Sequence, residues 1–209
     1  MTTLAVGADL SWSETLRTAL DRVPVDYVLL WIDDHFVIER VNNADIMAAI
    51  KGFLSVQGNY LRLHSLPKAD ERTNEYFGTV VSGAIYRTAT VASVWRRSVL
   101  KDLLKPGESA WDFETAGSLR SDAYEGFYST WRDCFRIENL LIKGRIRRSS
   151  RRRIECMLGT ALGIQRPMMT RVEESRFALK VIGNRMLIRL PRRLARVLRT
   201  ISYVGRGQC

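Results

Sequence analysis

The chain has 209 residues, of which 46% are hydrophobic; this is enough for a globular domain with a real core and excludes a disordered or fibrous protein. Its three cysteines form no CxxC pair, and no apolar run approaches the roughly 18 residues of a membrane span, so the sequence predicts no disulfide framework, zinc site or spanning helix. The net charge of +11 is uneven, because residues 143–209 hold 18 Lys and Arg against 3 Asp and Glu, whereas residues 1–142 hold 15 against 19.

The N-terminal part of the chain predicts two helices around one strand. Residues 11–23 begin with a serine cap candidate, carry leucines at helical spacing and end before Pro24, so they predict a helix. The mainly apolar run of residues 26–32 predicts a buried strand in a parallel arrangement, covered on both faces. Residues 42–57 carry apolar side chains three and four positions apart and predict a second helix.

The next stretch predicts two strands, a loop between them and a short helix. Residues 59–66 alternate in the manner of a strand, and residues 84–95, rich in Thr and Val, predict a longer one. The polar residues 67–78 between them predict a loop that is long enough to suggest a function. Residues 96–107 predict a helix that stops at a Pro-Gly pair. This order of elements is that of an α/β domain.

The remaining elements are predicted less regularly. Residues 108–131 begin as a loop and are expected to become helical from Ser118. Residues 133–146 predict a strand or hairpin, and residues 149–162 predict a helix.

Two adjacent aspartates, Asp33 and Asp34, come directly after the strand predicted at residues 26–32. Ligands of open α/β sheets bind beyond the carboxyl ends of the strands, where side chains point into a crevice. Mg²⁺ and Mn²⁺ take oxygen ligands and keep positions open for substrate phosphates, so the pair is well placed to hold such a cation. The alternative is an ordinary turn with Asp34 facing water, because such dipeptides are common in turns.

A second acidic segment lies at residues 106–114, where the carboxylates of Glu108, Asp112 and Glu114 alternate with aromatic side chains. Aromatic neighbours lower the local polarity, and partial burial raises the pKa of a carboxyl toward the range of a general base. Taken alone, the segment fits a surface loop anchored to the core by an aromatic pair better than it fits a catalytic site.

Four stretches are informative together: YVLLWIDDHF, YRTATVASVWRRSVLKDLLKPGESAWDFE, GSLRSD and ENLLIKGRI. They resemble a group of bacterial glycosyltransferases of the GT-A fold found among capsule, lipopolysaccharide and other surface-polysaccharide genes. The resemblance runs from about Trp12 to about residue 175, and its most specific part is the pattern Pro-Gly-Glu-x-x-Trp-x-Phe-Glu.

The resemblance implies transfer of a sugar from a nucleotide-sugar donor to an acceptor hydroxyl, with a divalent metal, Mn or Mg, as cofactor. Asp33 and Asp34 match the acidic element that binds this metal in GT-A enzymes. The reaction needs the metal because the leaving nucleoside diphosphate accumulates negative charge as the glycosidic bond breaks. His35 stands where the family pattern has an aromatic residue, so it either joins the metal or remains a neutral neighbour.

The resemblance also implies a carboxylate base that takes the acceptor proton in an inverting transfer. Glu114 is the expected base and Asp112 the alternative, while Trp111 is expected to line the sugar or acceptor pocket. Four further residues are assigned to substrate binding: Glu108, Arg120, Lys143 and Arg145.

Two departures from the family pattern affect these expectations. The acidic element is Asp-Asp rather than Asp-x-Asp. Family members also carry a βαβ portion before the matching segment, which holds the nucleotide base and ribose. The expected fold is therefore an N-terminally incomplete GT-A-like mixed sheet flanked by helices. It implies a truncated reading of a longer gene, a degenerate remnant or a non-catalytic partner subunit.

The basic C-terminal third is expected to meet an acidic partner. Residues 143–153 hold seven basic side chains, and arginines suit bidentate contacts to a donor diphosphate, a lipid pyrophosphate, a phospholipid surface or nucleic acid; the alternative is a solvated face. After Pro191, which fits a first helical turn, apolar residues lie on one helical stripe. The stripe consists of Leu190, Leu194, Val197, Leu198 and Ile201.

The stripe predicts either a helix in a membrane interface or one that packs on the core or on a second subunit. We divide the chain into a core at residues 1–142 and a basic, mainly helical region at residues 143–209. The leading expectation is a glycosyltransferase in the cytoplasm, peripheral on the inner face of the membrane, with a saccharide or lipid-linked acceptor. A nucleic-acid-binding module is the rival, disfavoured because the aromatic residues cluster around carboxylates rather than arginines.

Overall fold

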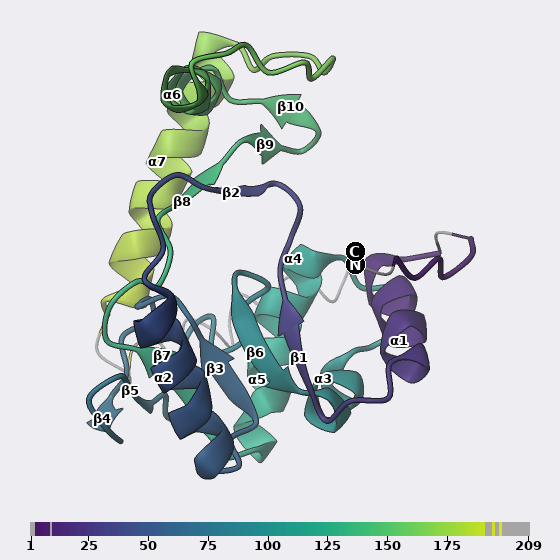
Figure 1. The fold of residues 1–209 in the computed structure, drawn as a ribbon, viewed down its shortest axis with the longest axis vertical. Coiled ribbons are helices and arrows are strands. Elements are labelled where there is room, and N and C mark those ends of the chain that lie inside the picture. Colours follow the sequence, from purple (N-terminus) through teal and green to yellow (C-terminus); the bar gives the residue numbers. More distant parts are fainter. Residues whose placement is uncertain (1–2, 9, 191–193, 195–196, 198–209) are drawn as a thin grey trace.

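The computed structural model describes residues 3–8, 10–190, 194 and 197. The described part is a mixed α/β protein built on a mixed six-stranded sheet (Figure 1), as the sequence predicted at this coarse level. Only β3 and β7 pair in parallel, and the other pairs in this sheet are antiparallel. In spatial order the strands are β1 (Tyr27–Leu30), β6 (Ser93–Arg96), β3 (Tyr60–Arg62), β7 (Phe127–Thr130), β5 (Phe77–Thr79) and β4 (Glu71–Arg72).

Helices cover both faces of this sheet (Figure 1). On one face α2 (Asn43–Ser55) packs through Ala49 and Phe53 against apolar side chains of β3 and β5. The other face is covered by α1 (Trp12–Arg22), α3 (Arg97–Leu103) and the segment described next. All three helices were predicted, α1 and α2 from a cap candidate and apolar periodicity and α3 from the Pro-Gly pair that stops it.

One nearly continuous helical segment runs from Ala110 to Ala123. It comprises α4 (Ala110–Asp112), the π-helical η1 (Phe113–Gly117), α5 (Ser118–Arg120) and the 3₁₀-helical η2 (Ser121–Ala123). The prediction that helix begins only at Ser118 was wrong. A capping box at its start, in which Ser109 and Asp112 each accept a hydrogen bond from the other's backbone N–H, begins the helix eight residues earlier.

The prediction of a parallel strand covered on both faces at residues 26–32 was also wrong. β1 pairs antiparallel with β6 at the edge of the sheet, and Leu29 is 57% exposed. A short apolar run does not specify whether the neighbouring strand runs parallel or antiparallel to it. Here the neighbour is β6, which runs in the opposite direction to β1.

Two loop assignments changed as well. Of the strand predicted at residues 84–95, only the last three residues belong to β6. In the preceding stretch the buried Arg87 guanidinium donates to the carbonyls of Val80, Ser121 and Tyr124, so side-chain hydrogen bonds replace a strand ladder there. The loop predicted at residues 67–78 instead contains β4 and the start of β5, which form an antiparallel hairpin.

A smaller unit lies beyond one end of the sheet, at the top of Figure 1. Its core consists of Leu140, Ile146 and Ile154, with Phe36 and Ile38 packed against them. Its elements are β2 (His35–Val37), β8 (Ile137–Asn139), β9 (Leu141–Ile142), β10 (Arg145–Ile146), α6 (Arg148–Leu158) and α7 (Arg171–Ile188).

The β9–β10 hairpin and α6 confirm the predictions for residues 133–146 and 149–162. The boundary after residue 142 stays a prediction, although the small core draws side chains from both sides of it. Most of the predicted tail helix lies outside the described residues, including Leu198, Ile201 and its arginines. No helix in the described ranges combines the length and apolarity needed to cross a membrane.

Candidate functional site

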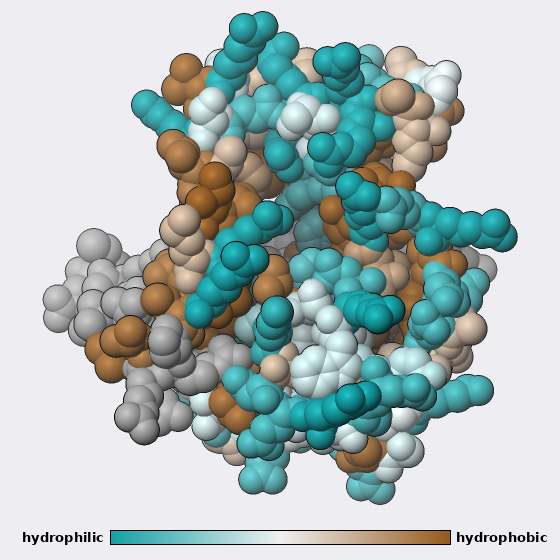
Figure 2. All heavy atoms as spheres, turned by 90° about the vertical axis from the view of Figure 1, so that its left-hand side faces the viewer, coloured by the Kyte–Doolittle hydropathy of each residue, from teal (hydrophilic) through white to brown (hydrophobic). Residues whose placement is uncertain are grey.

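One end of the six-stranded sheet gathers the candidate residues. Leu30, Ser93, Arg62 and Ser129 are successive register partners across β1, β6, β3 and β7. Residues that follow β1, β3 and β7, and residues that precede β6, therefore all emerge at this same end. We call it the open end of the sheet, and Figure 2 shows the surface recessed between the sheet and the smaller unit.

Asp33 and Asp34 form the turn that leaves β1 at the open end. The turn is closed by a hydrogen bond from His35 N to the carbonyl of Ile32 at 3.2 Å. Asp33 is exposed, whereas Asp34 is half-buried and its Oδ1 atom has no hydrogen-bond partner among the described residues. Burial raises the pKa of Asp34, the Asp33 carboxylate adds to that rise, and His35 opposes it.

Glu114 reaches the same end of the sheet from the helical segment. Its Oε1 atom accepts hydrogen bonds from Thr90 N at 2.9 Å and from Thr90 Oγ1 at 2.8 Å. Thr90 lies three residues before β6, beside the row of register partners. Burial raises the pKa of Tyr60 on β3, and the Glu114 carboxylate contributes to that rise.

Glu114 belongs to the π-helical turn η1. Short π-helical stretches within helices often occur at functional sites because they redirect individual side chains. Here Phe113 is fully buried against Trp95, with ring centroids 5.9 Å apart, while the next residue, Glu114, turns toward Thr90. Adjacent aromatic and acidic residues thus have different roles: Phe113 anchors the segment in the core, and Glu114 presents its carboxylate at the open end.

Asp112, Glu108 and Arg120 are all engaged in local structure. The Oδ2 atom of Asp112 accepts from Ser109 N at 3.0 Å and from Ser109 Oγ at 2.6 Å within the capping box. Arg120 donates to both carboxylate oxygens of Glu108, at 2.8 and 2.7 Å. This bidentate pair holds the loop after α3 against α5.

Trp111 is 56% exposed at the start of the helical segment, and the ammonium of Lys180 lies 5.6 Å from its ring centroid. This cation–π contact joins α4 to α7. Lys143 and Arg145 instead lie around the β9–β10 turn in the smaller unit, away from α4 in Figure 1, so the structure does not bring them to Glu114.

Four of the seven basic side chains at residues 143–153 form ion pairs within the smaller unit. Arg145 pairs with Glu173 at 2.7 Å, and Arg151 pairs with Glu155 at 2.7 Å. The buried Glu138 carboxylate faces two further arginines, Arg147 and Arg153. Three carboxylates of the same chain therefore offset part of the charge that suggested a phosphate or nucleic-acid partner, and the cluster stays positive overall.

The residues after β1 can be tested for a divalent cation. No three His, Cys, Asp or Glu side chains gather into a metal site within the part of the chain that the structure describes. Asp34 Oδ1 and His35 Nδ1 are nevertheless both buried and without a hydrogen-bond partner there, and Asp34 Oδ1 lies 3.8 Å from His35 Nε2. Since the His35 ring faces Asp34 through Nε2, its unpartnered Nδ1 points elsewhere, and a cation such as Mn²⁺ or Mg²⁺ at Asp34 Oδ1 would take most of its ligands from substrate phosphates and water.

Sequence reasoning missed two further residues at the open end. His64 follows β3, and its Nδ1 atom lies 3.5 Å from Asp133 Oδ1, which follows β7. Burial lowers the pKa of His64, while Asp133 opposes this effect. β3 was predicted from the sequence, but β7 lies in a stretch that was predicted as loop and helix. The pairing of His64 with Asp133 joins residues after these two strands, so no local pattern in the sequence indicates it.

The chain matches no protein-family model, and neither the curated proteins nor the solved structures contain a detectably similar protein. Its function is therefore inferred from the chemistry of the site.

Proposed function

We propose that this chain is a glycosyltransferase with a GT-A-like arrangement, or the acceptor-side part of one, which transfers a sugar from a nucleotide-sugar donor to a saccharide or lipid-linked acceptor. The observation that carries this proposal is the convergence of two acidic elements. The Asp33–Asp34 turn and the Glu114 carboxylate, some eighty residues apart in the sequence, emerge at the same end of one sheet.

In this proposal Glu114 is the general base. Thr90 fixes Oε1 with two hydrogen bonds, and Oε2 makes none among the described residues, so Oε2 is the oxygen that faces an acceptor hydroxyl. In an inverting transfer the acceptor O–H proton passes to Oε2, the acceptor oxygen forms a bond to the anomeric carbon, and the bond from that carbon to the diphosphate oxygen breaks. Asp112 fits this role less well, because Ser109 already binds its Oδ2 atom.

The divalent cofactor would be held by Asp34 and His35, with Asp33 beside them. When bound, it would offset the negative charge of the leaving nucleoside diphosphate. Asp34 serves this role only as a carboxylate. Trp111, exposed beside Lys180, is the aromatic side chain available to contact a sugar ring.

The test is release of nucleoside diphosphate from a panel of nucleotide-sugars in the presence of Mn²⁺ and oligosaccharide acceptors. Glu114→Gln keeps the shape of the side chain but removes its basicity, so turnover is expected to fall by roughly 10² to 10⁴-fold. Asp34→Asn is expected to raise the Mn²⁺ concentration required for half-maximal turnover.

Glu71→Gln is the matched control, because Glu71 is an exposed glutamate on β4. It should leave turnover unchanged. Equal turnover in wild type and in Glu114→Gln would remove the base assignment, and a well-folded wild type without turnover on any donor would favour a non-catalytic partner subunit.

Peripheral membrane contact is part of the proposal. Leu179, Ile182 and Met186 lie three and four residues apart on α7 and are all exposed, in a region whose net charge is strongly positive. Figure 2 shows apolar residues gathered on the side of the molecule that carries α7. An apolar stripe flanked by basic residues suits an anionic bilayer surface.

Sedimentation with vesicles tests this contact. Binding to phosphatidylglycerol vesicles should exceed binding to phosphatidylcholine vesicles, and Met186→Glu should weaken it several-fold. Met47→Glu, which changes an exposed methionine on α2, should bind like wild type. Equal binding by both variants would exclude α7 as the contact.

A further inference from the structure

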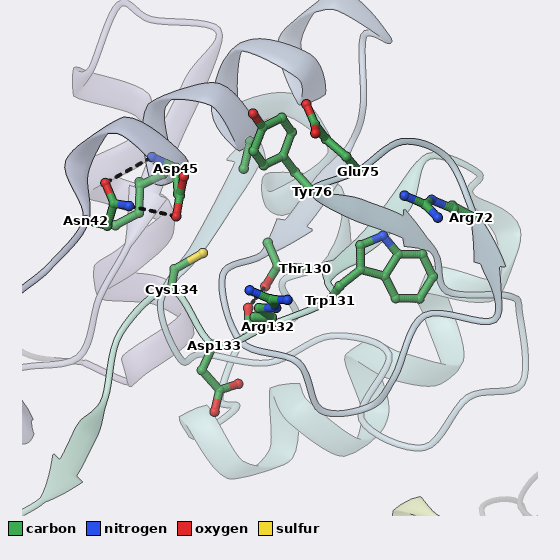
Figure 3. Close-up of a pocket in the computed structure, with 12 residues that line it drawn as sticks. Asn42, Asp45, Arg72, Glu75, Tyr76, Thr130, Trp131, Arg132, Asp133 and Cys134 are labelled. Atoms are coloured by element: carbon green, nitrogen blue, oxygen red, sulfur yellow. Dashed lines mark hydrogen bonds between the residues drawn. The ribbon is translucent and has the colours of Figure 1, made fainter.

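A cavity of about 630 Å³ lies beside the open end of the sheet, at the side away from β1 (Figure 3). Three segments build it: the start of α2, the β4–β5 hairpin and the residues that follow β7. Its volume is in the range of small-molecule binding pockets. None of the residues assigned to the proposed reaction lines it.

Trp131 forms a fixed aromatic wall of this cavity. Its indole N–H donates to the carbonyl of Asn74 at 3.0 Å, and its backbone N–H donates to the carbonyl of Tyr76 at 3.0 Å. A side chain on Gly78 would come within 2.6 Å of the indole ring, so the ring packs closely on bare backbone at that position. The ring is 37% exposed although it is held at three points, which is the arrangement of a preformed contact surface.

The polar groups that line the cavity are of both signs. Arg72 and Arg132 supply guanidinium groups, and Glu75, Asp45 and Asp133 supply carboxylates, of which Asp45 already accepts from Asn42 and Asp133 from Ser65. The Arg132 side chain is exposed and makes no hydrogen bond or ion pair among the described residues, and Arg72 uses only Nε, in a 3.3 Å bond to Asn74 O. Acceptors and donors of this kind both bind hydroxyl groups, and the near balance of charge favours neither a cation nor an anion.

One residue of the cavity also reaches the open end of the sheet. Asp133 lines the cavity and pairs with His64 at the open end. Glu114 is bound beside β6 in the segment that covers one face of the sheet, whereas the cavity begins after β7, two strands away, and is walled in part by α2 on the other face. A ligand longer than one sugar unit is needed to span that separation.

From these contacts we propose that the cavity binds a neutral saccharide unit of the acceptor, with a sugar ring packed on Trp131 and its hydroxyl groups bonded by Arg132 and the surrounding carboxylates. The role as an acceptor subsite rests on the function proposed above. Saccharide binding itself does not, because it requires neither the metal nor Glu114.

The experiment measures binding of the purified full chain to neutral tri- to pentasaccharides of glucose, galactose, mannose and N-acetylglucosamine, and to glucuronate-containing counterparts, by saturation-transfer NMR and calorimetry. At least one neutral saccharide should bind. Trp131→Ala and Arg132→Ala should each weaken that binding by tenfold or more, while Trp131→Phe, which keeps an aromatic plane, should retain part of it.

Arg152→Ala is the matched control, since Arg152 is exposed on α6 outside the cavity, and it should bind like wild type. Arg132→Ala guards against misfolding of the tryptophan variant, because the Arg132 side chain is exposed. The proposal is overturned if no saccharide binds, if the glucuronate forms bind more tightly, or if both cavity variants bind like wild type.

The same variants separate this proposal from the catalytic one. Glu114→Gln should bind the saccharide normally while losing turnover, and Arg132→Ala should raise the acceptor KM without changing the rate of donor hydrolysis. Saccharide binding by a chain that turns over no donor would support the cavity and contradict the transferase. If Trp131→Ala and Arg132→Ala both turn over donor with an unchanged acceptor KM, the transferase is supported and the acceptor role of the cavity is contradicted.

Discussion

Asp34 and Glu114 are carboxylates placed at one end of the same sheet, but their surroundings differ. Glu114 accepts two hydrogen bonds through one oxygen and keeps the other available. Asp34 has a buried oxygen without a donor, next to a second carboxylate. A carboxylate oxygen that is buried without a donor costs free energy, and His35 offsets only part of that cost, so the Asp34 charge lowers stability, as is common for residues that bind ligands.

Replacing Asp34 by asparagine should therefore stabilise the protein at neutral pH without added metal. Its raised pKa means that folding favours the protonated carboxyl, and the stability gained in that form is lost as the pH rises through the folded-state value. The amide imitates the protonated form, so a rise in Tm of roughly 2 °C is expected by calorimetry.

Asp33→Asn provides the control, because that carboxylate is exposed and its removal should change Tm much less. A lower Tm for Asp34→Asn than for wild type would show that the Asp34 charge has a stabilising partner.

At the scale of elements, the segment from Ala110 to Ala123 decides where the candidate base lies. Its start is fixed by the Ser109–Asp112 capping box, and the preceding loop is fixed by the Glu108–Arg120 pair. The sequence identified these acidic residues, but it did not show which of them stabilise the helical segment and which one is the candidate base. Three of the residues expected at the reaction site, Glu108, Asp112 and Arg120, instead hold the element that presents Glu114.

Ser109→Ala should destabilise the protein by about 1 kcal/mol, because it removes a side chain that satisfies a backbone N–H at the helix start. Urea denaturation followed by circular dichroism measures this change. Turnover should fall less than in Glu114→Gln, since the base itself remains.

Ser175→Ala is the comparison for this cap, because Ser175 lies exposed within α7. It should leave the urea midpoint unchanged. If the two alanine variants are equally stable, the capping box contributes nothing to the position of Glu114.

Across the whole molecule, His64 connects elements that are distant in sequence. Burial lowers its pKa; Arg62, Arg185 on α7 and His35 on β2 lower it further, and Asp133 opposes them. Its Nδ1 atom accepts a 3.3 Å hydrogen bond from Leu66 N, which a protonated imidazole cannot do. The neutral form of His64 is thus built into the junction between the sheet and the smaller unit.

This arrangement predicts a loss of stability in mild acid. Because the folded-state pKa lies below the reference value of 6.5, the unfolded chain takes up the proton first as the pH falls. The contribution of His64 is complete above that value and is lost as the pH falls through the folded-state pKa. Denaturation free energies at about pH 7.5 and about pH 5.5 should differ less in His64→Gln than in wild type.

A His64→Gln variant that keeps the full pH dependence of wild type would assign the effect to other groups.

The sequence alone determined the elements whose signals are local. α1 and α2 follow from periodic apolar residues and from side chains that cap nearby backbone groups, α3 stops at the Pro-Gly pair after it, and α6 was also predicted as a helix; each of these signals spans only a few residues. It also identified the two acidic segments as candidate sites.

Only the tertiary structure decided what those segments do together. The antiparallel partner of β1, the hydrogen bonds from Thr90 to Glu114 and the cavity beside Trp131 each join residues far apart in the chain. Side-chain hydrogen bonds from Arg87 to distant carbonyls likewise replaced a strand that local propensity favoured. Such long-range contacts form only when distant segments of the chain pack together. Their stability depends on both segments at once, so the pattern of a single stretch of sequence cannot predict them.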